Sequence, residues 1–129
     1  MGRIEDLVQR NNAAFSRGDV DGALAGWHDE GVLTPVPGGR SYQGREQILA
    51  FFTRDIYEIP EFDFRIYTVL EQGQYALVFG RYSVREDTHV VDRGIFWILE
   101  VGEGEVLKFE AYENVGEAFA EFKHLLDRG

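Results

Sequence analysis

Apolar side chains recur at the spacing of an amphipathic helix in four stretches of the chain. The first stretch covers residues 3–17, and the second follows the capping residue Asp19 and ends near His28. The third covers residues 45–56, and the fourth follows Asn114, a favourable residue for capping a helix. The apolar faces of these helices are predicted to contain Ile4, Leu7, Val8 and Phe15; Val20, Ala23, Leu24 and Trp27; Ile48, Phe51, Phe52 and Ile56; and Val115, Ala118, Phe119, Phe122 and Leu126.

From residue 61 onward the apolar positions alternate with a period of two, which is typical of strands. Short turns with polar residues or glycine separate the runs, so consecutive strands are expected to pair antiparallel in a meander. In one hairpin we expect Arg81 opposite Phe96 and Arg85 opposite Asp92. The four runs cover residues 62–71, 74–85, 93–102 and 105–113.

The order of these elements predicts an α+β fold. A short strand is expected over residues 32–34, and Pro35 should confine it to the edge of a sheet. Helices followed by four long strands and a last helix favour a cone, in which a curved antiparallel sheet wraps around the N-terminal helices. Such a cone can leave a cavity between the helices and the concave face of the sheet. The length of 129 residues fits one domain, 1–129.

Composition narrows the classes of partner. The formal net charge of −10 repels phosphate backbones and anionic lipid surfaces, so we expect neither nucleic-acid nor membrane binding. The chain has no Cys, which excludes disulfides and thiolate chemistry and favours a cytoplasmic location. Aromatic residues make up 14% of the chain, enough to fill a core or to line a cavity.

Three segments resemble a known family. The segments Phe15-Ser16-Arg17-Gly18-Asp19 and Trp27-His28-Asp29-Glu30-Gly31-Val32 are similar to the opening of SnoaL-like proteins. The segment Tyr42-Gln43-Gly44-Arg45-Glu46-Gln47-Ile48-Leu49-Ala50-Phe51-Phe52 is similar to a helix start in ketosteroid isomerases. The chain thus resembles the superfamily of nuclear transport factor 2 and ketosteroid isomerase over nearly its whole length. The resemblance implies a cystatin-like cone, and it implies several functions, because isomerases, dehydratases, cyclases, epoxide hydrolases and binding modules share this scaffold.

The resemblance also implies which residues surround the cavity. By position, Pro35 replaces the general base of ketosteroid isomerase, Asn11 its oxyanion-binding Tyr and Phe96 its protonated Asp. That catalytic set is absent, so we do not expect ketosteroid isomerisation by the usual mechanism. The resemblance points the odd-numbered residues of the strand over 74–85 into the cavity. The predicted ligand-binding residues are Phe15, Trp27, Pro35, Phe52, Phe79, Phe96 and Phe109.

Three polar residues are candidates for catalysis. Asn11 interrupts the apolar face of the first helix, so its amide bonds either a neighbouring group of the protein or a ligand oxygen. The resemblance aims Arg81 inward as a permanent charge that needs a carboxylate or an anionic ligand. Glu113 shares a strand face with Phe109, and burial would raise its pKa whereas Arg81 would lower it. Glu113 is therefore either a general acid or base or the structural partner of Arg81.

The remaining ionisable residues indicate no metal site. The three His residues are spaced unlike zinc ligands, and no calcium loop or phosphate-binding loop occurs. His28 is expected either to cap the end of the second helix or to transfer protons. No cofactor is implied.

Two functions remain open at this point. One is an isomerase, cyclase, dehydratase or hydrolase for a small apolar oxygenated substrate, and the other is a non-catalytic module that binds a ligand or a protein. A purely structural dimerisation domain is a third possibility. We expect Ile95, Trp97 and Leu99 on the outer face of the sheet, where so apolar a surface favours a homodimer.

Overall fold

The computed structural model describes residues 3–35, 37–54 and 63–128. Its sheet has six strands in the order β2-β1-β6-β5-β4-β3, in which β1 and β6 are parallel and the other neighbours antiparallel. In chain order the elements are α1 (Arg3–Ser16), α2 (Val20–Leu24), β1 (Trp27–Thr34), β2 (Tyr42–Gln43), α3 (Gly44–Thr53), β3 (Asp63–Gln72), β4 (Tyr75–Glu86), β5 (His89–Gly102), β6 (Glu105–Tyr112) and α4 (Val115–Arg128).

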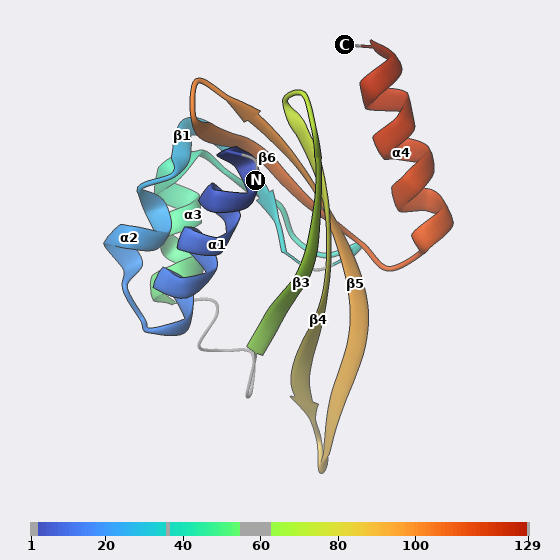
Figure 1. The fold of residues 1–129 in the computed structure, drawn as a ribbon. Helices are drawn as coiled ribbons and strands as arrows, with labels where there is room; N and C mark the ends of the chain where they lie inside the picture. The colour runs from blue at the N-terminus through green and yellow to red at the C-terminus, as the bar shows by residue number, and fades with distance from the viewer. Residues whose placement is uncertain (1–2, 36, 55–62, 129) are drawn as a thin grey trace.

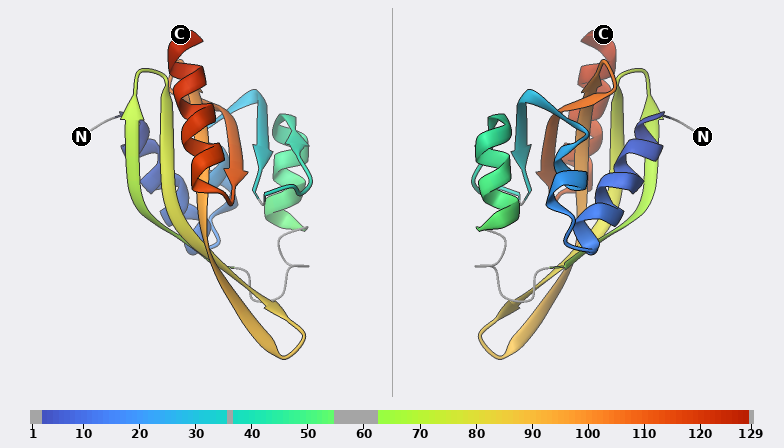
Figure 2. Two further views of the ribbon diagram at one scale, coloured as in Figure 1. Left: turned by 90° about the vertical axis from the view of Figure 1, so that its right-hand side faces the viewer. Right: turned by 90° about the vertical axis from the view of Figure 1, so that its left-hand side faces the viewer.

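The sheet is strongly curved and carries helices on both faces. Figure 1 shows α1, α2 and α3 on its concave side and α4 on the opposite side, and the two views in Figure 2 confirm this layering. The structure confirms the predicted α+β cone and the four-strand meander formed by β3, β4, β5 and β6. The predicted end of the third helix at residue 56 lies outside the described residues.

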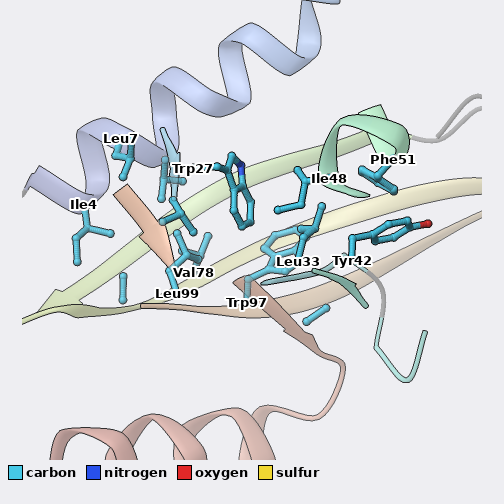
Figure 3. Close-up of a cluster of buried hydrophobic side chains, with 14 of the residues drawn as sticks. Ile4, Leu7, Trp27, Leu33, Tyr42, Ile48, Phe51, Val78, Trp97 and Leu99 are labelled. Atoms are coloured by element: carbon cyan, nitrogen blue, oxygen red, sulfur yellow. The ribbon is translucent and has the colours of Figure 1, made fainter. Parts of the chain in front are cut away.

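The main core fills the space between the concave face and the N-terminal helices. Figure 3 shows side chains from α1, α3 and the strands meeting there, with Trp27 and Trp97 between the helices and the sheet. Ile48, Ile95 and Val78 have no exposed surface. A second, smaller cluster on the convex face joins Leu77 and Ile98 to α4 and consists of buried Leu77, Ile98, Ala118 and Phe122.

The predicted second helix is too long, because α2 ends at Leu24 and Trp27 already begins β1. Glycine at position 26 disfavours helix, and its carbonyl oxygen accepts a hydrogen bond of 2.7 Å from the Val106 N–H of β6. The prediction that Pro35 places this strand at an edge is also wrong, since β1 lies between β2 and β6. Pro35 follows the last residue of β1, so its missing N–H removes no bond from the ladder.

The hairpin between β4 and β5 differs in register from the prediction. Phe79, rather than Arg81, pairs with Phe96, and Arg85 lies opposite Val90 rather than Asp92. The two-residue turn at residues 87–88 accounts for this, because Asp87 adopts a positive φ of 54° and lets the strands pair up to residues 86 and 89.

In β4 and β5, the residues predicted to point toward the cavity face outward, and the residues predicted to face outward point toward the core. Ala76 and Val78 of β4 face the N-terminal helices, together with Trp97 of β5. Leu77 and Ile98 face α4. Both faces are apolar here, so alternation alone did not distinguish the inside from the outside. The outer surface is covered in part by the chain's own last helix.

Close contact between strands occurs at Gly80. A bulge interrupts β3 between Ile66 and Thr68, and Gly80 of β4 pairs with Ile66 at this point. A Cβ atom on Gly80 would overlap the carbonyl oxygen of Arg65 and lie 2.8 Å from the Trp97 ring. Glycine therefore allows β3 and β4 to approach each other where the sheet bends.

Both terminal helices begin at side-chain caps. The N–H groups of Ile4 and Glu5 donate to Oε1 of Glu71 at 3.1 Å each, which ties α1 to β3. The prediction of a cap at Asn114 is confirmed, since its Oδ1 accepts a hydrogen bond of 3.0 Å from the Glu117 N–H. Over the described part of the chain, no helix is long and apolar enough to cross a membrane.

Candidate functional site

A cavity of about 60 Å³ lies between α1, α3 and the concave face of the sheet. A single water needs about 10–15 Å³ by this kind of measure, so the cavity has room for several waters or a small organic group. Its described lining consists of Val8, Asn11, Asn12, Phe15, Ala23, Trp27, Leu33, Pro35, Phe51, Phe52, Ile66, Trp97, Leu99, Val106 and Phe109.

Aromatic rings form two walls of the cavity. On one side Phe109 contacts both tryptophans, with ring centroids 6.3 Å from Trp27 and 5.7 Å from Trp97. On the other side Phe52 lies 5.8 Å from Phe15 and 5.3 Å from Phe51. These six rings give the lining a large aromatic surface, which suits planar or aliphatic carbon groups.

Two neighbouring amides are the polar part of this lining. Asn11 packs against Gly26, where a Cβ atom would lie 3.1 Å from its Oδ1. Oδ1 of Asn12 is buried and has no hydrogen-bond partner among the described residues. Asn12 was missed in the sequence, although it follows Val8 by four residues and so shares its helix face.

Six of the predicted site residues line this cavity. They include Asn11 among the proposed catalytic residues, and the ligand-binding residues are Phe15, Trp27, Pro35, Phe52 and Phe109. Phe79 and Phe96 pair across β4 and β5 on the other face, with ring centroids 5.1 Å apart. Their predicted orientation toward the cavity is wrong for the same reason as the orientation of β4.

Arg81 lies outside the cavity and is paired with a different carboxylate from the one predicted. Its Nε donates to Oδ1 of Asp92 at 2.9 Å, and its terminal nitrogen donates to the Asp92 carbonyl at 3.2 Å. Both side chains are about half exposed, so this ion pair contributes little to stability. The inward orientation expected for Arg81 is wrong, as is the expected pairing of Arg85 with Asp92.

Glu113 follows the end of β6 and is exposed. Phe109 and Ala111 of that strand do join the core, but the face that they share ends before Glu113. The structure therefore brings neither Glu113 nor Arg81 to the cavity. His28 lies in β1, where its Nδ1 accepts a hydrogen bond of 3.0 Å from the Glu30 N–H, so its predicted role as a helix cap is wrong.

Perturbed ionisable groups lie elsewhere. Burial raises the pKa of Tyr112, and the Glu110 carboxylate that accepts its hydrogen bond at 3.0 Å adds to this effect. The Gly22 N–H lowers the pKa of Asp19 by donating to its carboxylate at the start of α2. None of the described lining residues is ionisable. Within residues 3–35, 37–54 and 63–128, no three His, Asp or Glu side chains gather closely enough to hold a metal ion.

Solved structures share this architecture. An NTF2-like protein of unknown function from Burkholderia pseudomallei K96243 aligns with a TM-score of 0.77 and 21% identity, covering 95% of this chain and 98% of that one. TerC, co-crystallized with polyporic acid, aligns with a TM-score of 0.76 and 19% identity over 94% and 98% of the two chains. An LEH-like epoxide hydrolase from M. tuberculosis aligns with a TM-score of 0.70 and 18% identity, covering 92% of this chain and 88% of that one.

These identities establish a shared fold and no shared activity. None of the curated proteins matches the chain significantly in sequence. The model of the SnoaL-like domain family matches residues 8–113, which include all of the described cavity lining and all six strands. The chain therefore belongs to the SnoaL-like domain family.

Proposed function

We propose that the protein binds a small, largely apolar, oxygenated molecule in the cavity between α1, α3 and the sheet. The observation that carries this proposal is the lining, which is aromatic and aliphatic except for the two amides of Asn11 and Asn12. A few polar groups in an otherwise apolar hollow are typical of small-molecule sites. TerC, which has the same fold, was co-crystallized with the organic molecule polyporic acid.

Binding without acid–base catalysis is the form of this function that the lining favours. General acid–base chemistry requires a group that titrates within reach of the substrate, and no described lining residue titrates. Asn11 is the one proposed catalytic residue at the cavity, and it can hold an oxygen atom without moving a proton. The purpose of the site in this proposal is to select and hold a ligand.

A second candidate is an enzyme of the cyclase, isomerase, dehydratase or hydrolase type. The LEH-like epoxide hydrolase with the same fold favours it. In this case Asn11 would orient the substrate oxygen. Arg81 and Glu113, our other two catalytic candidates, would need a substrate that reaches beyond the cavity.

A thermal-shift screen of small phenols, ketones and hydrocarbons tests the proposal. A ligand at a hundred times its dissociation constant adds about 2.7 kcal/mol to the free energy of unfolding, which shifts the melting temperature measurably. Phe109→Ala and Phe79→Ala form a matched pair, because Phe109 lines the cavity and Phe79 faces away from it. We expect Phe109→Ala to change the affinity several-fold and Phe79→Ala to leave it unchanged. Equal effects of the two substitutions would contradict a site in this cavity.

We also propose that the protein forms a homodimer through the outer side of the sheet. The three residues expected to form an apolar outer surface, Ile95, Trp97 and Leu99, belong to the core and therefore do not support a dimer. A different set of apolar side chains supports the proposal, since about half of the surface of Tyr67 and of Phe119 is exposed. Sedimentation velocity at micromolar concentration is expected to show a dimer, and a monomer would contradict it.

A further inference from the structure

The described lining of the cavity divides into a buried part and a partly exposed part. Trp27 and Trp97 are only 3% and 2% exposed, and Leu99 and Val106 of the neighbouring strands are 1% exposed each. The partly exposed lining residues come from α1, α3, β3, β6 and the position after β1. A molecule that enters the cavity from solvent must pass between residues of this second group.

Three of the partly exposed lining residues gather at one end of the helical layer. Phe15 is in the last turn of α1, Phe52 is in the last turn of α3, and Ile66 lies near the start of β3. Figure 1 shows that the C-terminal ends of α1 and α3 and the start of β3 lie at the same end of the molecule, and Figure 2 agrees. This end is therefore a route by which solvent can reach the cavity.

The rings of Phe15 and Phe52 meet at this end. Their centroids are 5.8 Å apart and their planes are inclined by 58°, so the contact bridges α1 and α3. Phe51, which is 4% exposed, lies 5.3 Å from Phe52 and supports that ring from the buried side. A tilted aromatic pair shifts an equilibrium by a factor of about two to twelve. Such a contact favours the closed arrangement but can still open.

We infer that Phe15 and Phe52 form a gate, and that small neutral molecules enter and leave the cavity by parting these two rings. The inference concerns access to the cavity and therefore goes beyond the proposed function, which concerns what the cavity holds. Only the second of the two experiments below rests on the proposed function.

Quenching of tryptophan fluorescence by acrylamide tests the gate without any ligand. The chain has two Trp residues, and both line the cavity, so all of the tryptophan emission reports on molecules that reach its wall. We expect Phe52→Leu to raise the bimolecular quenching constant about threefold or more, because the ring pair is lost. Phe52→Tyr keeps a ring at this position and should match the wild type. Phe79→Leu, on the other face of the sheet, should also match it.

The second ring of the pair gives a further arm of this experiment. Phe15→Leu should raise the quenching constant as Phe52→Leu does, and the double variant should add little to either, because one missing ring already breaks the pair. Urea unfolding of each variant establishes that the unfolded fraction is too small to account for the quenching. An unchanged constant in both single variants, an equal rise in Phe79→Leu, or a double variant in which the two effects multiply would overturn the inference.

Exchange of 4-fluorotoluene, followed by ¹⁹F NMR, tests the gate on a bound molecule. We expect Phe52→Leu to raise the association and dissociation rate constants by similar factors, so that Kd changes less than either. A faster dissociation with an unchanged association rate constant would show that Phe52 is only part of the wall, and the inference would be wrong. If 4-fluorotoluene does not bind the wild-type protein, the proposed function is contradicted for apolar molecules of this size, and the quenching experiment alone decides for or against the gate.

Discussion

Replacing Gly80 with Ala tests whether the close approach of β3 and β4 leaves room for a Cβ atom at this position. In an ordinary strand this change is stabilising by about 0.5–1 kcal/mol, because Ala loses less conformational entropy than Gly on folding. Here the added Cβ would overlap the carbonyl oxygen of Arg65 and lie 2.8 Å from the Trp97 ring. Neither group is the free end of a flexible side chain, since one is strand backbone just before a bulge and the other is a ring in the core.

The magnitude follows from these two contributions. Overpacking a well-packed core costs about 1–3 kcal/mol and occasionally more, and a backbone contact belongs at the upper end of that range. After the entropic gain is subtracted, we expect Gly80→Ala to lower the free energy of unfolding by about 2 kcal/mol. With a urea dependence of about 1–3 kcal/mol per molar, the unfolding midpoint should fall by about 1 M.

Gly94→Ala is the matched control on the adjacent strand. The nearest heavy atoms to a Cβ at Gly94 are 3.8 Å away in Phe79 and 3.9 Å away in Arg81, which are ordinary van der Waals distances. We therefore expect the midpoint of Gly94→Ala to equal or exceed that of the wild type. Urea unfolding followed by tryptophan fluorescence, at one protein concentration, measures both variants. If Gly80→Ala unfolds at the same urea concentration as Gly94→Ala, the steric reasoning is refuted.

Three further predictions concern the helix caps and one tyrosine. Glu71→Ala should lower the free energy of unfolding by about 1 kcal/mol in urea, because two N–H groups of α1 lose their acceptor; an unchanged midpoint would show that this cap is dispensable. Asn114→Ala should cost about 1 kcal/mol, whereas Asn114→Asp keeps the cap and should cost much less. Folding raises the pKa of Tyr112, so its contribution to stability is complete below the ordinary tyrosine pKa of about 10 and is lost as the pH rises above it. The free energy of unfolding of Tyr112→Phe should therefore fall less than that of the wild type when the pH is raised from neutral to above about 10. If the two proteins lost the same free energy over this range, the role assigned to Tyr112 would be contradicted.

The local pattern of the sequence determined most of the elements and the ends of several. The period of 3.6 predicted α1 and α4, and the period of two predicted the four long strands, because the position of each side chain along a helix or strand follows from backbone geometry. Asn114 marked the start of α4 because its side chain bonds a backbone N–H only three residues away. Six of the predicted site residues do line the cavity, and they come from α1, β1, the position directly after β1, α3 and β6.

Only the tertiary structure decided which face of β4 points inward. Alternation places Ala76 and Leu77 on opposite faces, but both are apolar and buried, one against the N-terminal helices and one against α4. The register of the β4–β5 hairpin depended on a two-residue turn. That register brings the Asp92 carboxylate within hydrogen-bond distance of the Arg81 side chain. The parallel pairing of β1 with β6 joins residues far apart in the chain and leaves no mark in local periodicity. Whether Asn12 is paired is likewise a property of the whole cavity, since a buried oxygen is satisfied or not by groups from several elements.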